Sequence, residues 1–165
     1  MLHLIQSLVP RPLHRAALKG AHRVRHRWRL WRKVQLEGVS VILRSGAGEI
    51  LLVRHAYGPQ VWTLPGGGMK RGEEPVETAR REMQEELGAV LVDARYLGFV
   101  DETLSGSPHR AHVVTAGLDA PPAADRREIE SAAFFAPDSL PQPLSTLAAT
   151  RIALLEQAGA GKGSR

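Results

Sequence analysis

Cysteine is absent from this chain of 165 residues. Disulfide bonds, zinc sites built on thiolates and cysteine nucleophiles are therefore excluded, so any chemistry must come from carboxylates, histidines, hydroxyls or a bound metal. A chain without disulfides suits a reducing compartment, and we expect a cytoplasmic protein.

Long apolar runs are also missing, since no stretch approaches the roughly 18–20 apolar residues that span a bilayer. Residues 1–10 are apolar, but the positive charges follow them, whereas in a signal peptide the charges come first. No small-residue cleavage site is evident either. We therefore expect neither a membrane span nor secretion.

Acidic residues are lacking from residues 1–33, which carry nine of the 22 lysines and arginines. The other 13 basic residues stand against 17 acidic ones, which leaves the rest of the chain at −4. The overall charge of +5 therefore belongs to an N-terminal extension. The mildly acidic body suits a metal site better than a nucleic-acid groove.

The basic extension has a helical pattern, with arginine and histidine opposite one apolar stripe. The stripe is formed, at spacings of three or four, by Leu13, Ala17, Ala21, Val24, Trp28 and Trp31. Such a helix can bind an anionic membrane or RNA. We favour a packing role, as a cap on the domain or on the partner in a homodimer, because the stripe would otherwise be exposed to water.

Strand and helix patterns fill residues 34–158, which we interpret as one domain followed by a flexible tail at 159–165. We expect strands at 36–44, 49–54, 89–100, 111–118 and 129–136, with a hairpin-type connection at 45–48 and a loop at 105–108. We expect helices at 75–87, bounded by Pro75 and Gly88, and at 144–158. This order, without regular strand–helix alternation, predicts an α+β fold.

The helix expected at 75–87 carries three clustered acids, Glu82, Glu85 and Glu86. Their i, i+3, i+4 spacing places all three carboxylates on one face, where they repel one another. A solvated surface tolerates such a cluster. Alternatively, a Mg²⁺ ion would neutralise it, because Mg²⁺ prefers carboxylate and water oxygens and is often shared with substrate phosphates. Taken alone, the cluster leaves both interpretations open.

Three consecutive glycines, Gly66, Gly67 and Gly68, stand upstream of this helix. Glycine lets a backbone turn tightly or approach a ligand closely. A loop of this kind can offer carbonyls to a metal and amides to a phosphate. A plain turn between a strand and a helix is the alternative.

Together, the glycines and the acids resemble a family signature. The segment 67–89 resembles the Nudix box, G-x₅-E-x₇-R-E-U-x-E-E-x-G-U, at each defined position. These positions are Gly67, Glu73, Arg81, Glu82, Met83, Glu85, Glu86, Gly88 and Ala89, the last only weakly apolar. A looser resemblance to the family extends over residues 36–141.

The resemblance implies an α/β/α sandwich around a mixed β-sheet, and a hydrolase that cleaves a diphosphate linkage in a nucleoside-diphosphate-type substrate. It implies that Mg²⁺, with Mn²⁺ as a substitute, is held by Glu82, Glu85 and Glu86, with the Gly67 carbonyl as a further ligand. Arg81 would hold a carboxylate in place by a bidentate pair, with Glu73 beside it. Arg81 and the three glycines are the residues we expect to bind substrate.

The proton acceptor for the attacking water is not fixed by the box, because family members take it from the box helix or from a later loop. Within the helix we favour Glu85 over Glu82, because it lies centrally among close acids. Outside the helix we favour Glu128, because residues 127–134 resemble the family's late strand, with Glu130 as the fallback. For both, the alternative is a surface acid at the start of a strand.

The substrate is not selected by the sequence among ADP-ribose, dinucleoside polyphosphates, NADH, oxidised nucleoside triphosphates and capped RNA. Two other functions stay open: a catalytically silent Nudix-fold module that binds nucleotides, and an adaptor that uses the basic extension. We favour an enzyme, because a pure binding module has no use for three clustered acids.

Deleting residues 1–33 separates the two roles of the extension. If it is a cap, we expect the truncated chain to lose stability or change its oligomeric state, because apolar surface becomes exposed. Binding to vesicles of anionic lipid should be weak before and after the deletion. The contrary result is salt-reversible vesicle binding by the full chain alone, with an unchanged melting temperature after truncation.

Overall fold

The computed structural model describes residues 36–104, 106–123 and 128–160, so the expected extension at 1–33 lies outside the described residues. Within them the chain forms an α+β fold, as predicted. Its elements are β1 (Leu36–Leu43), β2 (Ile50–His55), β3 (Gly66–Gly68), α3 (Pro75–Leu87), β4 (Leu91–Leu104), β5 (Ser107–Leu118), β6 (Ile129–Phe135) and α4 (Thr146–Ala160).

The strands form a mixed sheet, as predicted, and a second, two-stranded sheet. The larger sheet has the order β3-β1-β5-β4, and β2 pairs with β6 in a second, antiparallel sheet. The larger sheet is mixed, because β1 runs parallel to β5 and antiparallel to β3. Strands β1 and β2 are joined by the tight turn predicted at 45–48, but beyond one bridge, Arg44 to Ile50, they diverge into different sheets.

The three glycines form a short strand, β3, and the prediction of a loop there was wrong. Gly67 pairs with Val39 and Gly66 with Ser40 of β1. Gly66 has a φ of +150°, and a β-carbon on it would lie 2.1 Å from the carbonyl oxygen of Val39. Only a residue without a side chain fits this close pairing, so the glycine run extends the sheet toward the helix that follows.

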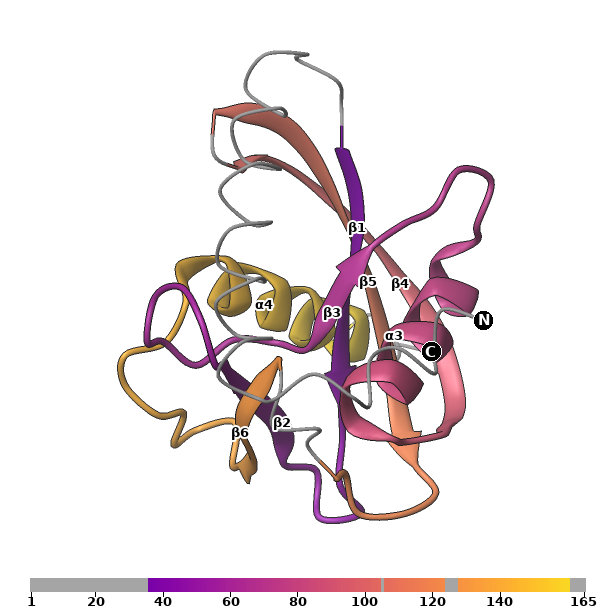
Figure 1. Ribbon diagram of the computed structural model, residues 1–165. Coiled ribbons are helices and arrows are strands. Elements are labelled where there is room, and N and C mark those ends of the chain that lie inside the picture. The colour runs from indigo at the N-terminus through magenta and orange to yellow at the C-terminus, as the bar shows by residue number, and fades with distance from the viewer. Residues whose placement is uncertain (1–35, 105, 124–127, 161–165) are drawn as a thin grey trace, which may run out of the picture.

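Strands β4 and β5 form a longer hairpin than the sequence indicated. Pairing continues from Leu91 opposite Leu118 to Leu104 opposite Ser107, which leaves little of the loop expected at 105–108. In Figure 1 this hairpin projects well past helices α3 and α4. Its far part carries polar residues, among them Glu102 opposite His109.

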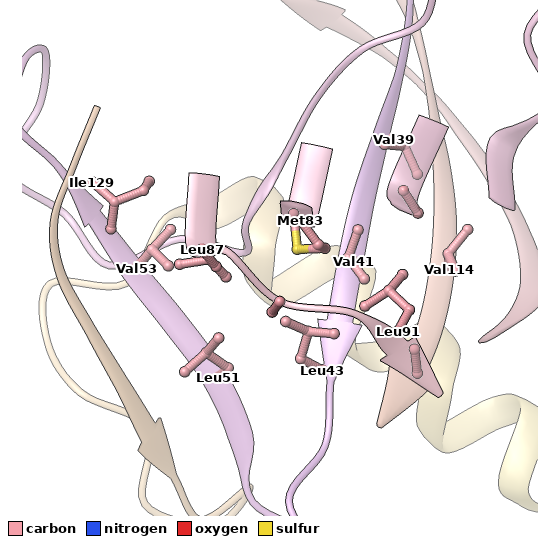
Figure 2. Packing of buried hydrophobic residues seen from close by; sticks show 13 residues of the cluster. Val39, Val41, Leu43, Leu51, Val53, Met83, Leu87, Leu91, Val114 and Ile129 are labelled. Atoms are coloured by element: carbon pink, nitrogen blue, oxygen red, sulfur yellow. The ribbon is translucent and has the colours of Figure 1, made fainter. Parts of the chain in front are cut away.

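Helix α3 covers one face of the larger sheet. It spans the predicted residues, with Pro75 in its first turn and Gly88, at φ 61°, as its C-terminal cap. Its apolar side is fully buried against β1, β2 and β5 (Figure 2). The helix residues that pack there are Ala79, Met83 and Leu87.

Helix α4 covers the opposite face. Alternate residues of β1 point to opposite faces of the sheet, and Val41 belongs to the core under α3 while Ile42 packs with Ala148 and Ile152 of α4. The two helices thus flank the sheet (Figure 1). This is the predicted sandwich. Neither helix in the described part of the chain is long and apolar enough to cross a membrane.

Replacing Gly66 with alanine should disrupt β3. The new methyl group would overlap the Val39 carbonyl, so we expect the free energy of unfolding to fall by about 3 kcal/mol or more. Gly68→Ala is the matched control, because a β-carbon there meets no atom within 4 Å and its φ is not positive. Denaturant unfolding measures both variants; equal stability would contradict the packing described for Gly66.

Candidate active site

Gly67 and Glu82 are in direct contact where β3 meets α3. A β-carbon on Gly67 would lie 2.3–2.5 Å from the carboxylate atoms of Glu82. The missing side chain therefore lets the helix carboxylate rest against the strand backbone. This contact brings together two residues, fifteen positions apart in sequence, that were predicted as ligands of one metal ion.

Glu73 and Arg81 form the bidentate pair that the sequence suggested. The Arg81 Nε and Nη2 atoms lie 2.8 and 2.9 Å from the two Glu73 oxygens. The amide of Lys70 also donates to Glu73, at 3.0 Å. Hydrogen bonds from Arg81, and then from Lys70, lower the pKa of Glu73 from 4.5 to about 2. The Glu73 carboxylate is therefore ionised throughout the neutral pH range, and its ion pair with Arg81 does not depend on pH in that range.

Arg81 also reaches beyond this pair. Its Nη1 donates to Glu82 at 2.6 Å and its Nη2 to the Gly68 carbonyl at 3.1 Å, and Glu85 lies 3.7 Å from Nη1. The side chain therefore ties the loop before α3, strand β3 and the helix to one another. With most of its N–H groups used in this way, Arg81 acts on the protein itself. Its predicted contact with substrate stays a prediction.

The three clustered glutamates share a helix face but differ in exposure. The Glu82 side chain is 13% exposed, Glu85 is 53% exposed, and Glu86 is buried, with 7% of its surface accessible. Arg81 draws Glu82 toward the glycine strand. Among the described residues, no group of three or more histidine, aspartate or glutamate side chains is already arranged to hold a metal ion.

The donor set nevertheless fits a hard divalent cation. Besides pairing with Glu73, the Arg81 guanidinium contacts two of the three clustered carboxylates, Glu82 and Glu85. All their donor atoms are oxygens, which Mg²⁺ and Mn²⁺ accept. The contact of Glu82 with the Gly67 backbone places carbonyl oxygen and carboxylate in the same small region. These residues stay the predicted metal ligands.

A cleft of about 510 Å³ opens beside the glycine strand. Gly66, Gly67 and Gly68 border it on one side. His55, the last residue of β2, and Tyr57, in the loop that follows, border it on another side. Burial lowers the pKa of His55, so its imidazole is mainly neutral at pH 7. The predicted substrate-binding glycines thus lie on the wall of a cleft large enough for a nucleoside.

Glu128, the predicted base outside the helix, lies immediately before β6. It is partly buried, and its carbonyl accepts a hydrogen bond of 2.9 Å from Ala56, next to the cleft residues His55 and Tyr57. Glu130 is exposed on β6. Both residues therefore stay candidates for the base, with Glu128 nearer to the cleft lining.

Sequence reasoning missed a second polar cluster at this cleft. Arg151 of α4 is 8% exposed, donates to the Ser40 hydroxyl at 2.8 Å and is paired with Glu102 of β4. Glu102 also lies 2.9 Å from Nδ1 of His109. No local motif marks these residues, because they come from three distant elements.

Comparison with known proteins agrees with the box and the fold. The family profile described as NUDIX domain matches residues 34–157. A Nudix hydrolase described as uncharacterised, from Pseudomonas aeruginosa, is 34% identical over 131 residues, which are 71% of this chain and 76% of the relative. The crystal structure of a MutT NUDIX hydrolase from Burkholderia pseudomallei is 34% identical with a TM-score of 0.64, and the match covers 74% of this chain and 97% of that one.

An RNA pyrophosphohydrolase from Rhodospirillum rubrum is 38% identical over 76 residues, which are 42% of this chain and 46% of the relative. The chain thus spans less than half the length of that relative. The NUDIX profile, by contrast, covers most of the described residues, and it includes both the Gly67–Glu82 contact and the Glu73–Arg81 pair. The chain belongs to the Nudix hydrolase family.

Proposed function

We propose that this protein hydrolyses a diphosphate linkage in a nucleoside-diphosphate-type substrate with the help of Mg²⁺. The observation that carries the proposal is the contact between the Glu82 carboxylate and the Gly67 backbone, at the edge of the cleft. It brings the acidic helix face to the wall on which a phosphate chain would lie. Glu82, Glu85 and Glu86, with the Gly67 carbonyl, would hold the ion.

When bound, the ion would neutralise phosphate oxygens and make water a stronger nucleophile at phosphorus. The residues of the chain supply the rest. Arg81 fixes the position of Glu82, because it holds that carboxylate and the Gly68 carbonyl at the same time. The amides of the glycine strand can donate to phosphate oxygens where β3 is not paired with β1.

Glu85 is the acid we assign as proton acceptor. It is the most exposed of the three clustered carboxylates, so a water molecule can reach it, whereas Glu86 is buried and Glu82 is held by Arg81. A carboxylate within hydrogen-bond reach can take a proton from that water as its oxygen attacks phosphorus. The phosphate on the far side of the broken bond then leaves with the electron pair.

A catalytically silent nucleotide-binding module is the second candidate. It would use the cleft and the glycine strand, but it gives no role to the exposed Glu85 beside Glu82 and Glu86. We therefore prefer hydrolysis.

Metal-dependent turnover is the first test. We expect the full chain with Mg²⁺ to release phosphate or pyrophosphate products from at least one member of a panel, and chelator to abolish this. The panel holds ADP-ribose, NADH, dinucleoside polyphosphates, nucleoside triphosphates and 5′-triphosphorylated RNA; the RNA is included because some relatives are RNA pyrophosphohydrolases. Nucleotide binding without any turnover would support the silent module.

Replacing Glu85 with glutamine should lower kcat by about 10²-fold or more with folding retained, since general bases and metal ligands typically contribute that much. The matched control is Glu77→Gln on the same helix, because Glu77 is 67% exposed and pairs only loosely, at 3.8 Å, with Arg80. We expect near-normal kcat from that control. An active Glu85→Gln beside an inactive Glu128→Gln would move the assignment of the base to Glu128.

A further inference from the structure

Glu102 is the centre of a buried polar network at the cleft. Its side chain is 9% exposed, and one of its oxygens accepts hydrogen bonds from both Arg151 and His109. The Arg151 guanidinium also donates to Ser40 on β1. The network therefore connects α4, β1 and the β4–β5 hairpin on the face of the sheet that α4 covers.

Two members of this network border the cleft and one lies behind them. Arg151 and His109 are cleft-lining residues, whereas Glu102 is not. Because an ionised carboxylate only accepts hydrogen bonds, Glu102 fixes the proton of His109 on Nδ1. The other nitrogen, Nε2, then points to Gly38, where a β-carbon would come within 3.0 Å of it. Gly38 borders the same cleft as His109, and its missing side chain leaves that space beside Nε2 open.

We propose that Arg151 and His109, positioned by Glu102, contact the uncharged nucleoside part of the substrate and help to set its specificity. This inference rests on the proposed function, because it assigns a ligand group to the part of the cleft that lies away from the acidic helix. The diphosphate would lie along the glycine strand. The nucleoside would extend toward α4.

The charges of the network favour an uncharged ligand group. Glu102 cancels the charge of Arg151, so this wall of the cleft offers a phosphate little net attraction. The Arg151 Nε is buried without a hydrogen-bond partner in the described part of the chain, and it is a donor. With its proton on Nδ1, the His109 ring presents Nε2 as an acceptor. A sugar hydroxyl or a base amide both donates and accepts, whereas a phosphate oxygen at neutral pH mainly accepts.

A purely structural role explains the network less well. Buried ion pairs contribute little net stability, because desolvation of both charges offsets their attraction, and apolar residues can often replace them without loss. Leu147 and Leu104 border the same cleft and show that apolar side chains suit this region. Three polar residues from three elements are better explained by a ligand that needs them.

Asp101 supplies a matched control one residue away. It forms a bidentate pair with Arg110, at 2.8 and 2.9 Å, in the same hairpin. Neighbouring residues of a strand point to opposite faces, so this pair lies on the other side of the sheet from Glu102 and is exposed. Asp101→Asn therefore replaces a paired carboxylate by an amide, as Glu102→Gln does, at a residue that does not line the cleft.

The experiment measures ligand binding by calorimetry for three variants, Glu102→Gln, Arg151→Lys and Asp101→Asn. Two probes are used. AMP or GMP contains a nucleoside, and inorganic tripolyphosphate does not. For Glu102→Gln we expect nucleotide affinity to fall about 10-fold, because the neutral amide removes the charge that holds the Arg151 guanidinium and its oxygen accepts more weakly from Arg151 and His109 than a carboxylate does. Tripolyphosphate affinity should change by less than about twofold. Asp101→Asn should bind both probes like the wild type.

Ring ¹⁵N shifts of His109 provide a second readout: we expect its proton on Nδ1 in the wild type and a larger share on Nε2 in Glu102→Gln, because the glutamine NH2 group can donate to Nδ1 and a carboxylate cannot. If Glu102→Gln does not fold, Arg151→Lys carries the test, because it keeps the charge and loses the fork of donors. Equal loss of both probes, or unchanged nucleotide affinity in a destabilised variant, would overturn the inference. Failure of the proposed function would appear separately, as absent turnover by the wild type while its nucleotide binding still depends on Glu102.

Discussion

The Arg81 guanidinium holds three separate parts of the box together. It pairs with Glu73 in the loop before α3, donates to the Gly68 carbonyl of β3 and contacts Glu82 on its own helix. A planar fork of donors can make these bonds in fixed directions at once, which a lysine cannot do. The spacing of these residues suits this geometry, because each partner must come within reach of one side chain while the glycine strand leaves room for the Glu82 carboxylate.

The acidic face of α3 is maintained by burial on its other side. Mutual repulsion of Glu82, Glu85 and Glu86 opposes helix formation. Complete burial of Met83 and Leu87 offsets that repulsion, since each such side chain contributes about 1.5–3 kcal/mol. The helix can therefore keep a chemically useful cluster that would be unfavourable in isolation. The acidic face and the buried apolar face that stabilises the fold lie on opposite sides of the same thirteen-residue helix.

Features that depend on residues close in sequence were predicted correctly, and features that depend on distant residues were missed. The bounds of α3 were correct because Pro75 and Gly88 act locally, and the Glu73–Arg81 pair followed from a motif of fixed spacing. The glycine strand was missed because its pairing with β1 depends on a distant backbone oxygen, that of Val39. The separation of β1 from β2 was missed for a related reason: alternation identifies a strand, but it does not say which strand will be its neighbour.

The β4–β5 hairpin shows why a substrate wall is harder to predict than a catalytic helix. Asp101 and Glu102 are consecutive acids, and each faces a basic or imidazole side chain on β5. In sequence they are equivalent. In the fold, one pair is exposed on the outer face, while the other is enclosed by Arg151 from a helix that begins more than forty residues later. The residues of the box lie within one short segment of the chain, whereas the opposite wall is assembled from distant elements. A fold of this kind can therefore retain one reaction while its specificity changes.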